Sequence, residues 1–392
     1  MKKSLFAIAA VTAFAGAAQA QSSVTVYGIL DAGYVGGNQR AQTTTVQGSN
    51  NNNFAISGAE STSRLGFKGV EDLGGGKTAF FTVEVTLSGD TTAVLGGTRQ
   101  AFVGLGDKKL GSAMVGTQNT VIYEAVGKTD PGQQNNIAGN VIYAISSNQT
   151  VNNSTFGQTD AYTVRTSNTL KYVSPNFAGL TVKATYALNN DNTTQTGAYN
   201  VSGGSSNGGT TNYNGWGLGA DYAWKKLLVT ANYQALKSVN PYGSGTTAAN
   251  PYTPADAAWT GTTGGVNTQD NQAYVAATYD FGILKAYGQW INRKATAVQS
   301  SNFYVKRSAQ QIGVRSFITP KIEGWASVGN GRFSGFGNSN PTANFTGYQL
   351  GSNYWLSKRT NMYAIFGSTG TSTTTAGAAS QNNYAVGVRH TF

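Results

Sequence analysis

The chain has 392 residues, and only 11% of them are charged, against about 25% in an ordinary soluble domain. It contains no Cys and one His, which excludes a disulfide framework, a thiol nucleophile, an iron–sulfur cluster and a multi-histidine metal site. The 27 basic and 16 acidic residues give a net charge of +11, and 21 Tyr with 17 Phe are too many for a disordered chain. We therefore expect a folded protein without a metal or a cofactor.

The first 20 residues predict a secretory signal peptide. Lys2 and Lys3 precede an apolar stretch over 5–15, and Ala18 and Ala20 form an A-x-A cleavage motif. An N-terminal membrane anchor is the alternative, but the apolar run is shorter than the roughly 20 residues that span a bilayer. We expect cleavage before Gln21, which leaves 25 basic and 16 acidic residues, or +9.

Alternating apolar and polar residues predict β-strands in the rest of the chain. In 78–87, Val83 and Val85 share one side and Glu84 lies on the other, and 181–188, 284–293 and 384–392 alternate in the same way. Helical spacing is not sustained anywhere after the leader. No apolar run is long enough to span a membrane as a helix, so both a soluble all-β protein and a membrane β-barrel fit.

Aromatic residues near the ends of the predicted strands favour the barrel. Their amphipathic rings suit the two interfacial girdles of a membrane barrel, although cross-strand aromatic pairing is the simpler alternative. The residues with this placement are Tyr27, Tyr34, Tyr172, Trp216, Tyr222, Trp224, Tyr279, Phe281, Tyr354 and Trp355.

Short turns alternate with long polar stretches along the chain, as in a membrane barrel. The short turns are 74–76, 107–109, 175–179, 280–282 and 357–360, and the long stretches are 36–53, 118–160, 189–214, 238–270, 297–301, 335–344 and 369–382. The 372 residues after the leader give about 23 residues for each of 16 strands, a reasonable mean for a membrane barrel of that size. We expect one domain, residues 21–392, with no internal boundary.

Five segments resemble the general porins of Gram-negative bacteria, in their beta-proteobacterial branch: 23–31, 61–76, 171–180, 357–363 and 386–392. The resemblance runs across the whole chain after the leader. It implies a 16-stranded antiparallel barrel in the outer membrane, assembled as a homotrimer. Each protomer would hold a water-filled pore for passive diffusion of small hydrophilic solutes and ions. The third long loop, within about 118–160, would fold inward and narrow the pore.

The resemblance also implies acidic residues of this loop opposite basic residues of the wall. The candidates on the loop are Glu124 and Asp130, and the basic candidates on the wall are Arg64, Lys68, Arg99, Arg165 and Lys171. Glu84 lies on the inward face of its predicted strand, and we expect it near these basic residues. Alternation supports Arg64 and Lys68, because a lipid-facing Arg would cost about 2–4 kcal/mol. It does not support Arg99, whose alternate neighbours Ala101 and Val103 are apolar. The alternative is that these charges merely line a solvated interior.

The basic residues predict a weak preference for anions, because walls of one sign concentrate counter-ions. The preference should be modest, since related porins often have an Arg after the glycine of the fifth strand and here Gly116 is followed by Thr117. Scattered basic residues without a basic run argue against nucleic-acid binding.

The terminal Phe392 ends the strand that must pair with the first strand to close a barrel. By resemblance, an alternating aromatic strand that ends in Phe is also the signal for the outer-membrane assembly machinery. An enzyme is not expected, because the lone His390 lies on the lipid-facing side of that strand. The remaining alternative is a secreted soluble adhesin or lectin-like protein.

Overall fold

The fold is known from a computed structural model, which describes residues 23–41, 49–55, 58–88, 94–144, 156–158, 161–193, 209–239, 268–298, 304–336, 342–373 and 379–392. The predicted leader, residues 1–20, lies outside the described residues. Within these ranges nearly all regular structure is β-strand, with one helix, α2 (Val121–Thr129).

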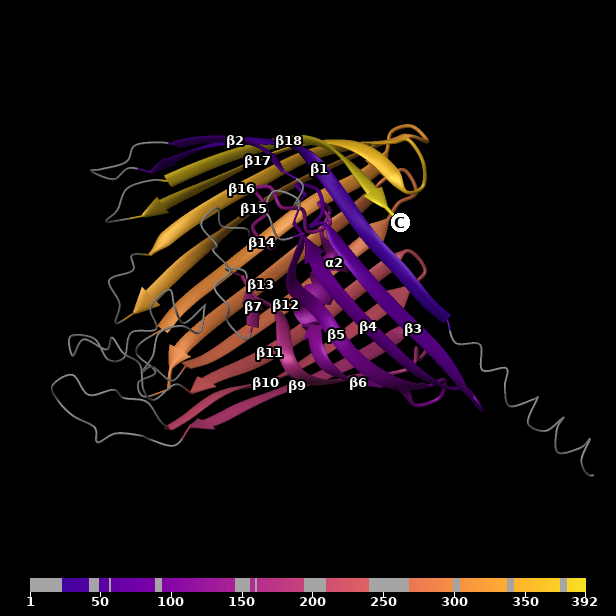
Figure 1. Cartoon of the computed structure of the whole chain (residues 1–392). Coiled ribbons are helices and arrows are strands. Elements are labelled where there is room, and N and C mark those ends of the chain that lie inside the picture. Colours follow the sequence, from indigo (N-terminus) through magenta and orange to yellow (C-terminus); the bar gives the residue numbers. More distant parts are fainter. Residues whose placement is uncertain are drawn as a thin grey trace, which may run out of the picture.

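The strands are, in chain order, β1 (Ser23–Ala41), β2 (Ser49–Ala55), β3 (Arg64–Gly74), β4 (Lys77–Leu87), β5 (Leu95–Asp107), β6 (Gly111–Asn119), β7 (Phe156–Gln158), β8 (Thr163–Val173), β9 (Leu180–Thr193), β10 (Gly209–Trp224), β11 (Leu227–Val239), β12 (Thr268–Asp280), β13 (Lys285–Ala297), β14 (Tyr304–Phe317), β15 (Ile322–Phe336), β16 (Ala343–Trp355), β17 (Thr360–Thr373) and β18 (Ala379–Thr391). Figure 1 shows them tilted around a common axis.

These strands form one closed antiparallel barrel of sixteen strands, as predicted. β2 and β3 pair with successive parts of β1 and together make one barrel strand, interrupted before Arg64, whereas β7 pairs only with β8. The barrel closes because β18 pairs with β1, from Ile29 opposite Thr391 to Ala41 opposite Ala379. Closure leaves no free sheet edge around the ring, so each strand finds backbone partners on both sides.

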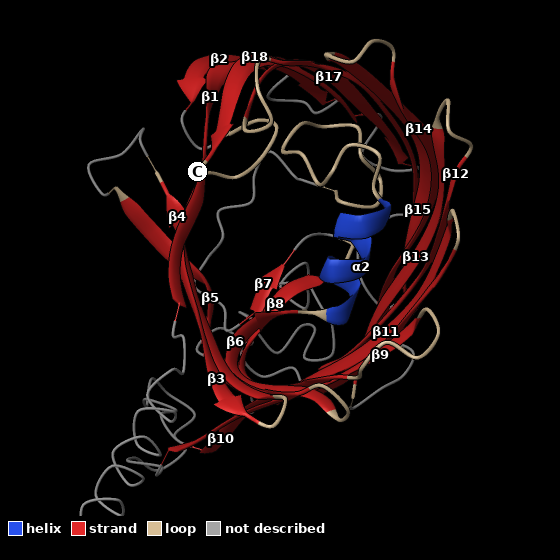
Figure 2. Ribbon diagram, turned by 90° about the vertical axis from the view of Figure 1, so that its right-hand side faces the viewer, coloured by secondary structure: helices blue, strands red, loops and turns tan. Residues whose placement is uncertain are grey.

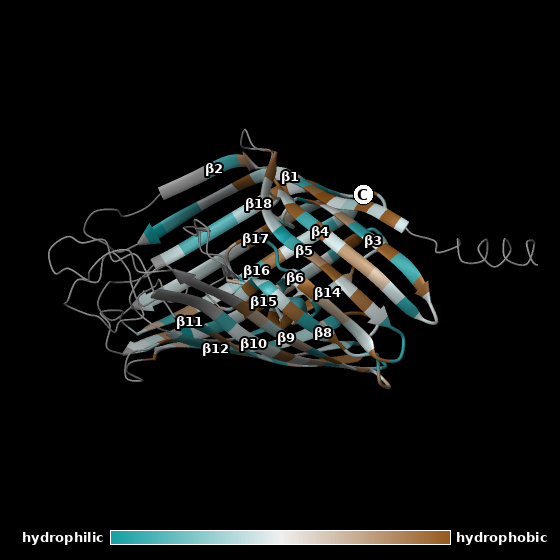
Figure 3. Ribbon diagram, turned by 60° about the horizontal axis from the view of Figure 1, so that its bottom comes forward, coloured by the Kyte–Doolittle hydropathy of each residue, from teal (hydrophilic) through white to brown (hydrophobic). Residues whose placement is uncertain are grey.

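The two faces of the barrel have opposite polarity. Along β12 the buried side chains that face inward include Asp270 and Gln272, whereas Val275 and Tyr279 on the other side are 46% and 43% exposed. The same alternation of polar and apolar residues runs through the other strands (Figure 3). The predicted alternation in 78–87 is confirmed, because Glu84 is 5% exposed and Val83 is 42% exposed. No helix in the described ranges is long and apolar enough to cross a membrane.

The aromatic positions divide between the two faces. Seven of the ten predicted girdle residues are well exposed on the outside: Tyr172, Trp216, Tyr222, Trp224, Tyr279, Phe281 and Tyr354. The girdle prediction is wrong for Tyr27 and Trp355, which face the interior. Tyr27 Oη donates a hydrogen bond to Glu84, and Trp355 Nε1 donates a hydrogen bond to Glu323. Both partners are buried carboxylates of the interior. Position near a strand end does not by itself decide which face a side chain takes.

The five predicted short turns are confirmed, and they lie together at one end of the barrel, where β1 begins and β18 ends (Figure 1). Several predicted long loops are wrong at their edges, and three of them are substantially shorter than predicted. β1 and β2 extend into 36–53, β9 and β10 extend into 189–214, and β17 and β18 extend into 369–382. These sequences are polar on both faces, so periodicity did not mark them as strands. The predicted absence of helices after the leader is also wrong, because the segment 118–160 contains the helix α2.

Candidate channel constriction

A long segment after β6 folds into the barrel instead of returning directly to the wall (Figure 2). We call its described residues, 120–144, 156–158 and 161–162, the inward loop. It begins at Thr120, whose side chain caps α2 by accepting a hydrogen bond from the Tyr123 amide. The helix contacts strands from β8 to β13, so it lies against one side of the barrel interior.

Apolar contacts seat α2 on the wall. Its side chains Val121 and Ile122 are completely buried and share one cluster with Tyr274 and Ile291 of the barrel. Small wall residues let the helix approach closely, since a Cβ at Gly219 would lie 3.2 Å from Val121 Cβ. Burial of this kind stabilises by about 25 cal/mol for each Å² of apolar surface. The helix therefore belongs to the folded core of the barrel interior.

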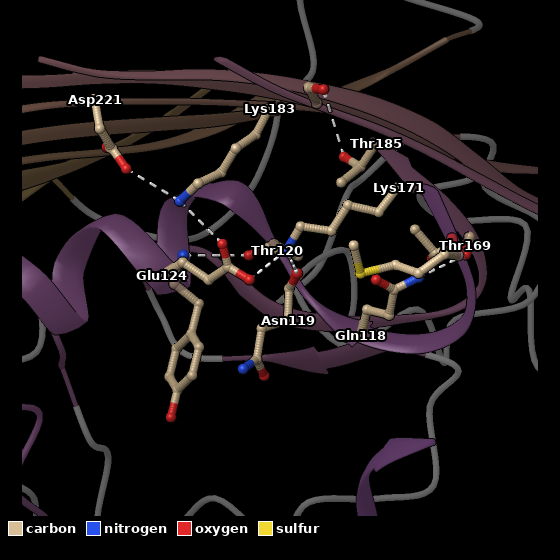
Figure 4. Close-up of polar contacts among 12 residues, drawn as sticks. Gln118, Asn119, Thr120, Glu124, Thr169, Lys171, Lys183, Thr185 and Asp221 are labelled. Carbon is tan, nitrogen blue, oxygen red and sulfur yellow. Dashed lines mark hydrogen bonds and ion pairs between the residues drawn. The ribbon is translucent and has the colours of Figure 1, made fainter. Parts of the chain in front are cut away.

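A chain of ion pairs holds the same helix to β8, β9 and β10 (Figure 4). Glu124 pairs with Lys171 and, at 3.0 Å, with Lys183. Lys183 also lies 3.1 Å from Asp221, which is 2.6 Å from Lys128 at the end of α2. We call these five residues the anchor cluster. Burial opposes ionisation of Glu124, but the two ammonium groups outweigh it and hold the pKa of this carboxyl below its usual value.

Asp130 organises the turn that follows the helix. Its carboxylate accepts hydrogen bonds from the Gln134 amide at 2.6 Å and from Asn140 Nδ2 at 2.9 Å. Burial raises the pKa of the Asp130 carboxyl in spite of these donors. Arg315 Nη1 donates to the adjacent Pro131 carbonyl at 2.8 Å, so a wall residue holds this turn as well.

The tip of the inward loop is fastened to the wall segment 58–63, which interrupts the second barrel strand. Asn136 Nδ2 donates to the Gly58 carbonyl at 2.8 Å and to Thr62 Oγ1 at 3.1 Å. The segment itself is held by Asp31, whose carboxylate accepts hydrogen bonds from the Ser61 amide and from Tyr363 Oη, each at 2.6 Å. The loop is thus fixed at the helix, at the turn and at the tip.

Four basic side chains and one carboxylate lie on the neighbouring part of the wall, on β3, β4, β5 and β8. Arg99 Nε lies 2.7 Å from Glu84 Oε1, and Tyr27 Oη donates to the other oxygen of Glu84. The Lys68 ammonium is 5.4 Å from the centre of the Tyr27 ring. We call Arg64, Lys68, Arg99, Arg165 and Glu84 the basic cluster.

The basic cluster meets the inward loop at an aromatic surface. The Arg165 guanidinium stacks 5.2 Å from the centre of the Tyr123 ring, and Tyr143 lies beside Tyr123 with ring centres 6.3 Å apart. Arg64 is directed by hydrogen bonds to the Thr62 carbonyl at 3.0 Å and to Ser61 Oγ at 3.2 Å. Cations can therefore be held against the loop by ring faces instead of by carboxylates.

Arg99 faces inward because of a β-bulge. The register of β4 with β5 shifts between Glu84 and Val85, which pair with Gln100 and Thr98, so Arg99 is the extra residue. The shift reverses the alternation along β5 and turns Arg99 inward to a 6% exposed position, although Val103 faces outward at 63%. The alternation of residues in the sequence does not reveal this shift in pairing. It therefore did not support an inward position for Arg99.

The eight predicted site residues fall into three groups. Arg64, Lys68, Glu84, Arg99 and Arg165 form the basic cluster, Glu124 and Lys171 belong to the anchor cluster, and Asp130 lies in the loop turn. The analysis of the sequence missed Tyr123 and Tyr143 as partners of the cations, and Asp221 as a partner of Lys183. The only sequence signal for Lys183 is its place on the polar side of the alternating segment 181–188. Within the described residues, no group of three His, Cys, Asp or Glu could hold a metal ion.

A family model described as Gram-negative porin matches residues 7–374. This chain belongs to that family. It is 28% identical over 430 residues to an outer membrane porin protein of Bordetella pertussis, with all of both chains covered. It is also 36% identical over 201 residues to outer membrane porin protein 32 of Delftia acidovorans, covering 49% of this chain and 51% of that one.

Solved structures agree with the fold. An anion-selective porin from Comamonas acidovorans superposes with a TM-score of 0.68 at 22% identity, covering 95% of this chain and all of that one. The outer membrane protein OmpT of Vibrio cholerae, in a trimer form, gives 0.60 at 14% identity, with coverage of 95% and 99%. The protein is therefore an outer-membrane porin that forms a channel, and the soluble adhesin is not favoured. Its family and fold are those of channels and not of enzymes.

Proposed function

We propose that this porin is an anion-preferring diffusion channel whose constriction is the gap between the basic cluster and the inward loop. One observation carries the proposal: among the described residues, four cations of the wall, Arg64, Lys68, Arg99 and Arg165, are accompanied by one carboxylate, that of Glu84. A small hydrophilic anion entering this gap meets a net positive field, and it leaves chemically unchanged.

The balance of charge on the loop supports the same conclusion. Glu124 is neutralised by Lys171 and Lys183, and Asp130 is buried among hydrogen-bond donors. Neither carboxylate is available to offset the basic cluster. Charges of one sign in a confined passage with low-dielectric walls raise the local concentration of counter-ions. The similar fold of the anion-selective Comamonas porin adds support.

The test is the double variant Arg64→Gln/Arg165→Gln in planar bilayers under a salt gradient. We expect the ratio of anion to cation permeability, obtained from the reversal potential, to fall several-fold, whereas Glu84→Gln should raise it. The control is Arg40→Gln/Lys237→Gln, which removes two exposed cations away from the gap. A ratio unchanged in the first variant would falsify the assignment of the constriction.

We further propose that the channel works as a homotrimer and that residues 1–20 are removed on export. The trimer form of a similar fold in Vibrio cholerae supports the first point, and the basic, apolar and A-x-A sequence supports the second. Protein extracted from outer membranes should migrate as a heat-sensitive trimer and begin at Gln21. A stable monomer, or a retained leader, contradicts the corresponding point.

A further inference from the structure

Exposed basic side chains form a rim at the end of the barrel that carries the short turns. They lie in or beside the turns that join β3 to β4, β5 to β6, β10 to β11, β14 to β15 and β16 to β17. We call them the basic rim: Lys77, Lys108, Lys109, Lys225, Lys226, Lys321, Lys358 and Arg359. All eight are exposed.

The carboxylates at this end are largely engaged in shaping the turns. Asp72 accepts a hydrogen bond from the Gly74 amide at 2.9 Å, Asp107 from the Lys109 amide at 2.8 Å, and Asp280 from the Gly282 amide at 2.7 Å. In the described part of the chain, no salt bridge joins a carboxylate to a side chain of the basic rim. The rim therefore presents net positive charge outward.

Large apolar side chains stand next to these cations. Leu110 is 71% exposed beside Lys108 and Lys109, and Trp224 is 54% exposed beside Lys225, whose ammonium lies 4.8 Å from the ring centre. Leu73, Ile318 and Leu356 lie in or beside the same turns and are 51%, 72% and 53% exposed. An exposed apolar group beside a cation suits the boundary between acyl chains and headgroups.

The opposite end of the barrel has a different composition. The connecting segments 42–48, 89–93, 194–208, 240–267, 299–303, 337–341 and 374–378 contain no Lys or Arg in their sequence, and they include Asp90 and Asp256. Basic turns are thus confined to the short-turn end, which in outer-membrane barrels is the periplasmic end. The requirement for solubility alone does not explain so one-sided a distribution.

We propose that the basic rim binds the phosphate groups of anionic phospholipids in the periplasmic leaflet of the outer membrane. The ammonium and guanidinium groups pair with the phosphodiesters, and the neighbouring apolar side chains enter the acyl region below them. Each cation near an anionic bilayer surface contributes about fivefold to binding. The ring of such contacts fixes the depth and tilt of the barrel.

The test uses the full chain in phosphatidylethanolamine vesicles that contain either brominated phosphatidylglycerol or brominated phosphatidylethanolamine. Bromine quenches nearby tryptophans, and Trp224 lies at the rim. We expect stronger quenching by the anionic lipid at equal mole fraction, and a relative affinity that falls by more than fivefold in Lys225→Gln/Lys226→Gln. Trp224→Phe should remove most of the excess quenching. Arg40→Gln/Lys237→Gln should retain it, and heat-modified migration on gels confirms that each barrel is folded.

Equal quenching by the two lipids overturns the proposal, and so does an unchanged preference in Lys225→Gln/Lys226→Gln. A different outcome is that the wild type shows no lipid preference but co-sediments with purified peptidoglycan, and that Lys225→Gln/Lys226→Gln does not. This outcome overturns the proposal and assigns the rim to the cell wall. If Lys225→Gln/Lys226→Gln and Arg40→Gln/Lys237→Gln lose the preference for the anionic lipid to the same extent, only the net charge of the protein matters. This result also overturns the proposed site at the rim.

Discussion

Replacement of Glu124 by Gln is expected to release α2 from the barrel wall and to turn a steady channel into a flickering one. The change leaves Lys128, Lys171 and Lys183 facing Asp221 alone. Removing one partner from a buried ion pair costs about 3–5 kcal/mol, because the other charge stays desolvated. Since the Glu124 side chain is 28% exposed, we expect the lower end of this range.

Single-channel recording measures this release as frequent closures and a spread of conductance levels. Glu84→Gln is the matched control, because it removes an interior carboxylate that binds wall residues and not the loop. The double variant Glu124→Gln/Lys183→Gln also removes one of the lysines that Glu124→Gln leaves without its carboxylate partner. Part of the steady conductance of the wild type should therefore return. A quiet Glu124→Gln channel would mean that the apolar seat of α2 suffices.

The same cluster predicts how the wild-type channel responds to pH. The pKa of Glu124 is depressed in the folded protein, chiefly because the nearby lysines outweigh its burial. Its contribution is therefore fully present above the ordinary pKa of about 4.3 and is lost as the pH falls through the lower value of the folded state. Recordings should stay quiet from neutral pH down to about 4.3 and become noisy only in more acid solution. Noise that begins near neutral pH would point to another group.

Adding a single methyl group at Gly28 is expected to prevent closure of the barrel. Gly28 N donates to the Phe392 carbonyl at 3.1 Å, and Phe392 N donates to the Gly28 carbonyl at 3.2 Å. A Cβ at Gly28 would lie 2.4 Å from Cζ of the Phe392 ring and 2.6 Å from the Arg64 carbonyl oxygen. The ring can move, but the β3 backbone cannot move without opening the seam, and each unpaired backbone group in lipid costs several kcal/mol.

The yield of heat-modifiable barrel measures closure. Gly28→Ala should lower it by more than tenfold, whereas Gly288→Ala should not, because nothing lies within 4 Å of a Cβ at Gly288. Removal of Phe392 should also lower the yield in cells. If detergent refolding rescues the Phe392 deletion but not Gly28→Ala, Phe392 acts through the assembly machinery as well as through the seam. A normal yield of Gly28→Ala contradicts the argument.

The alternation of side chains predicted β-strands and the interior position of residues such as Arg64, and the resemblance to porins supplied the number of strands. It failed at Arg99 because one extra residue in β5 reverses the alternation, and a bulge leaves no periodic trace in a sequence. It failed also for α2, a helix of nine residues that is stabilised by its seat on the wall. Short helices owe their stability to such tertiary contacts.

By itself, the sequence determined alternating strands with one polar and one apolar face and a basic balance of charge, because each of these properties is local or additive along the chain. The number of sixteen strands came from the resemblance to porins. Only the tertiary structure decided which charges meet. Glu124 could have faced Arg64 or Arg165, yet it pairs with Lys171 and Lys183. That choice depends on how the inward loop crosses the interior and on the register of distant strands, and neither is encoded in any short segment.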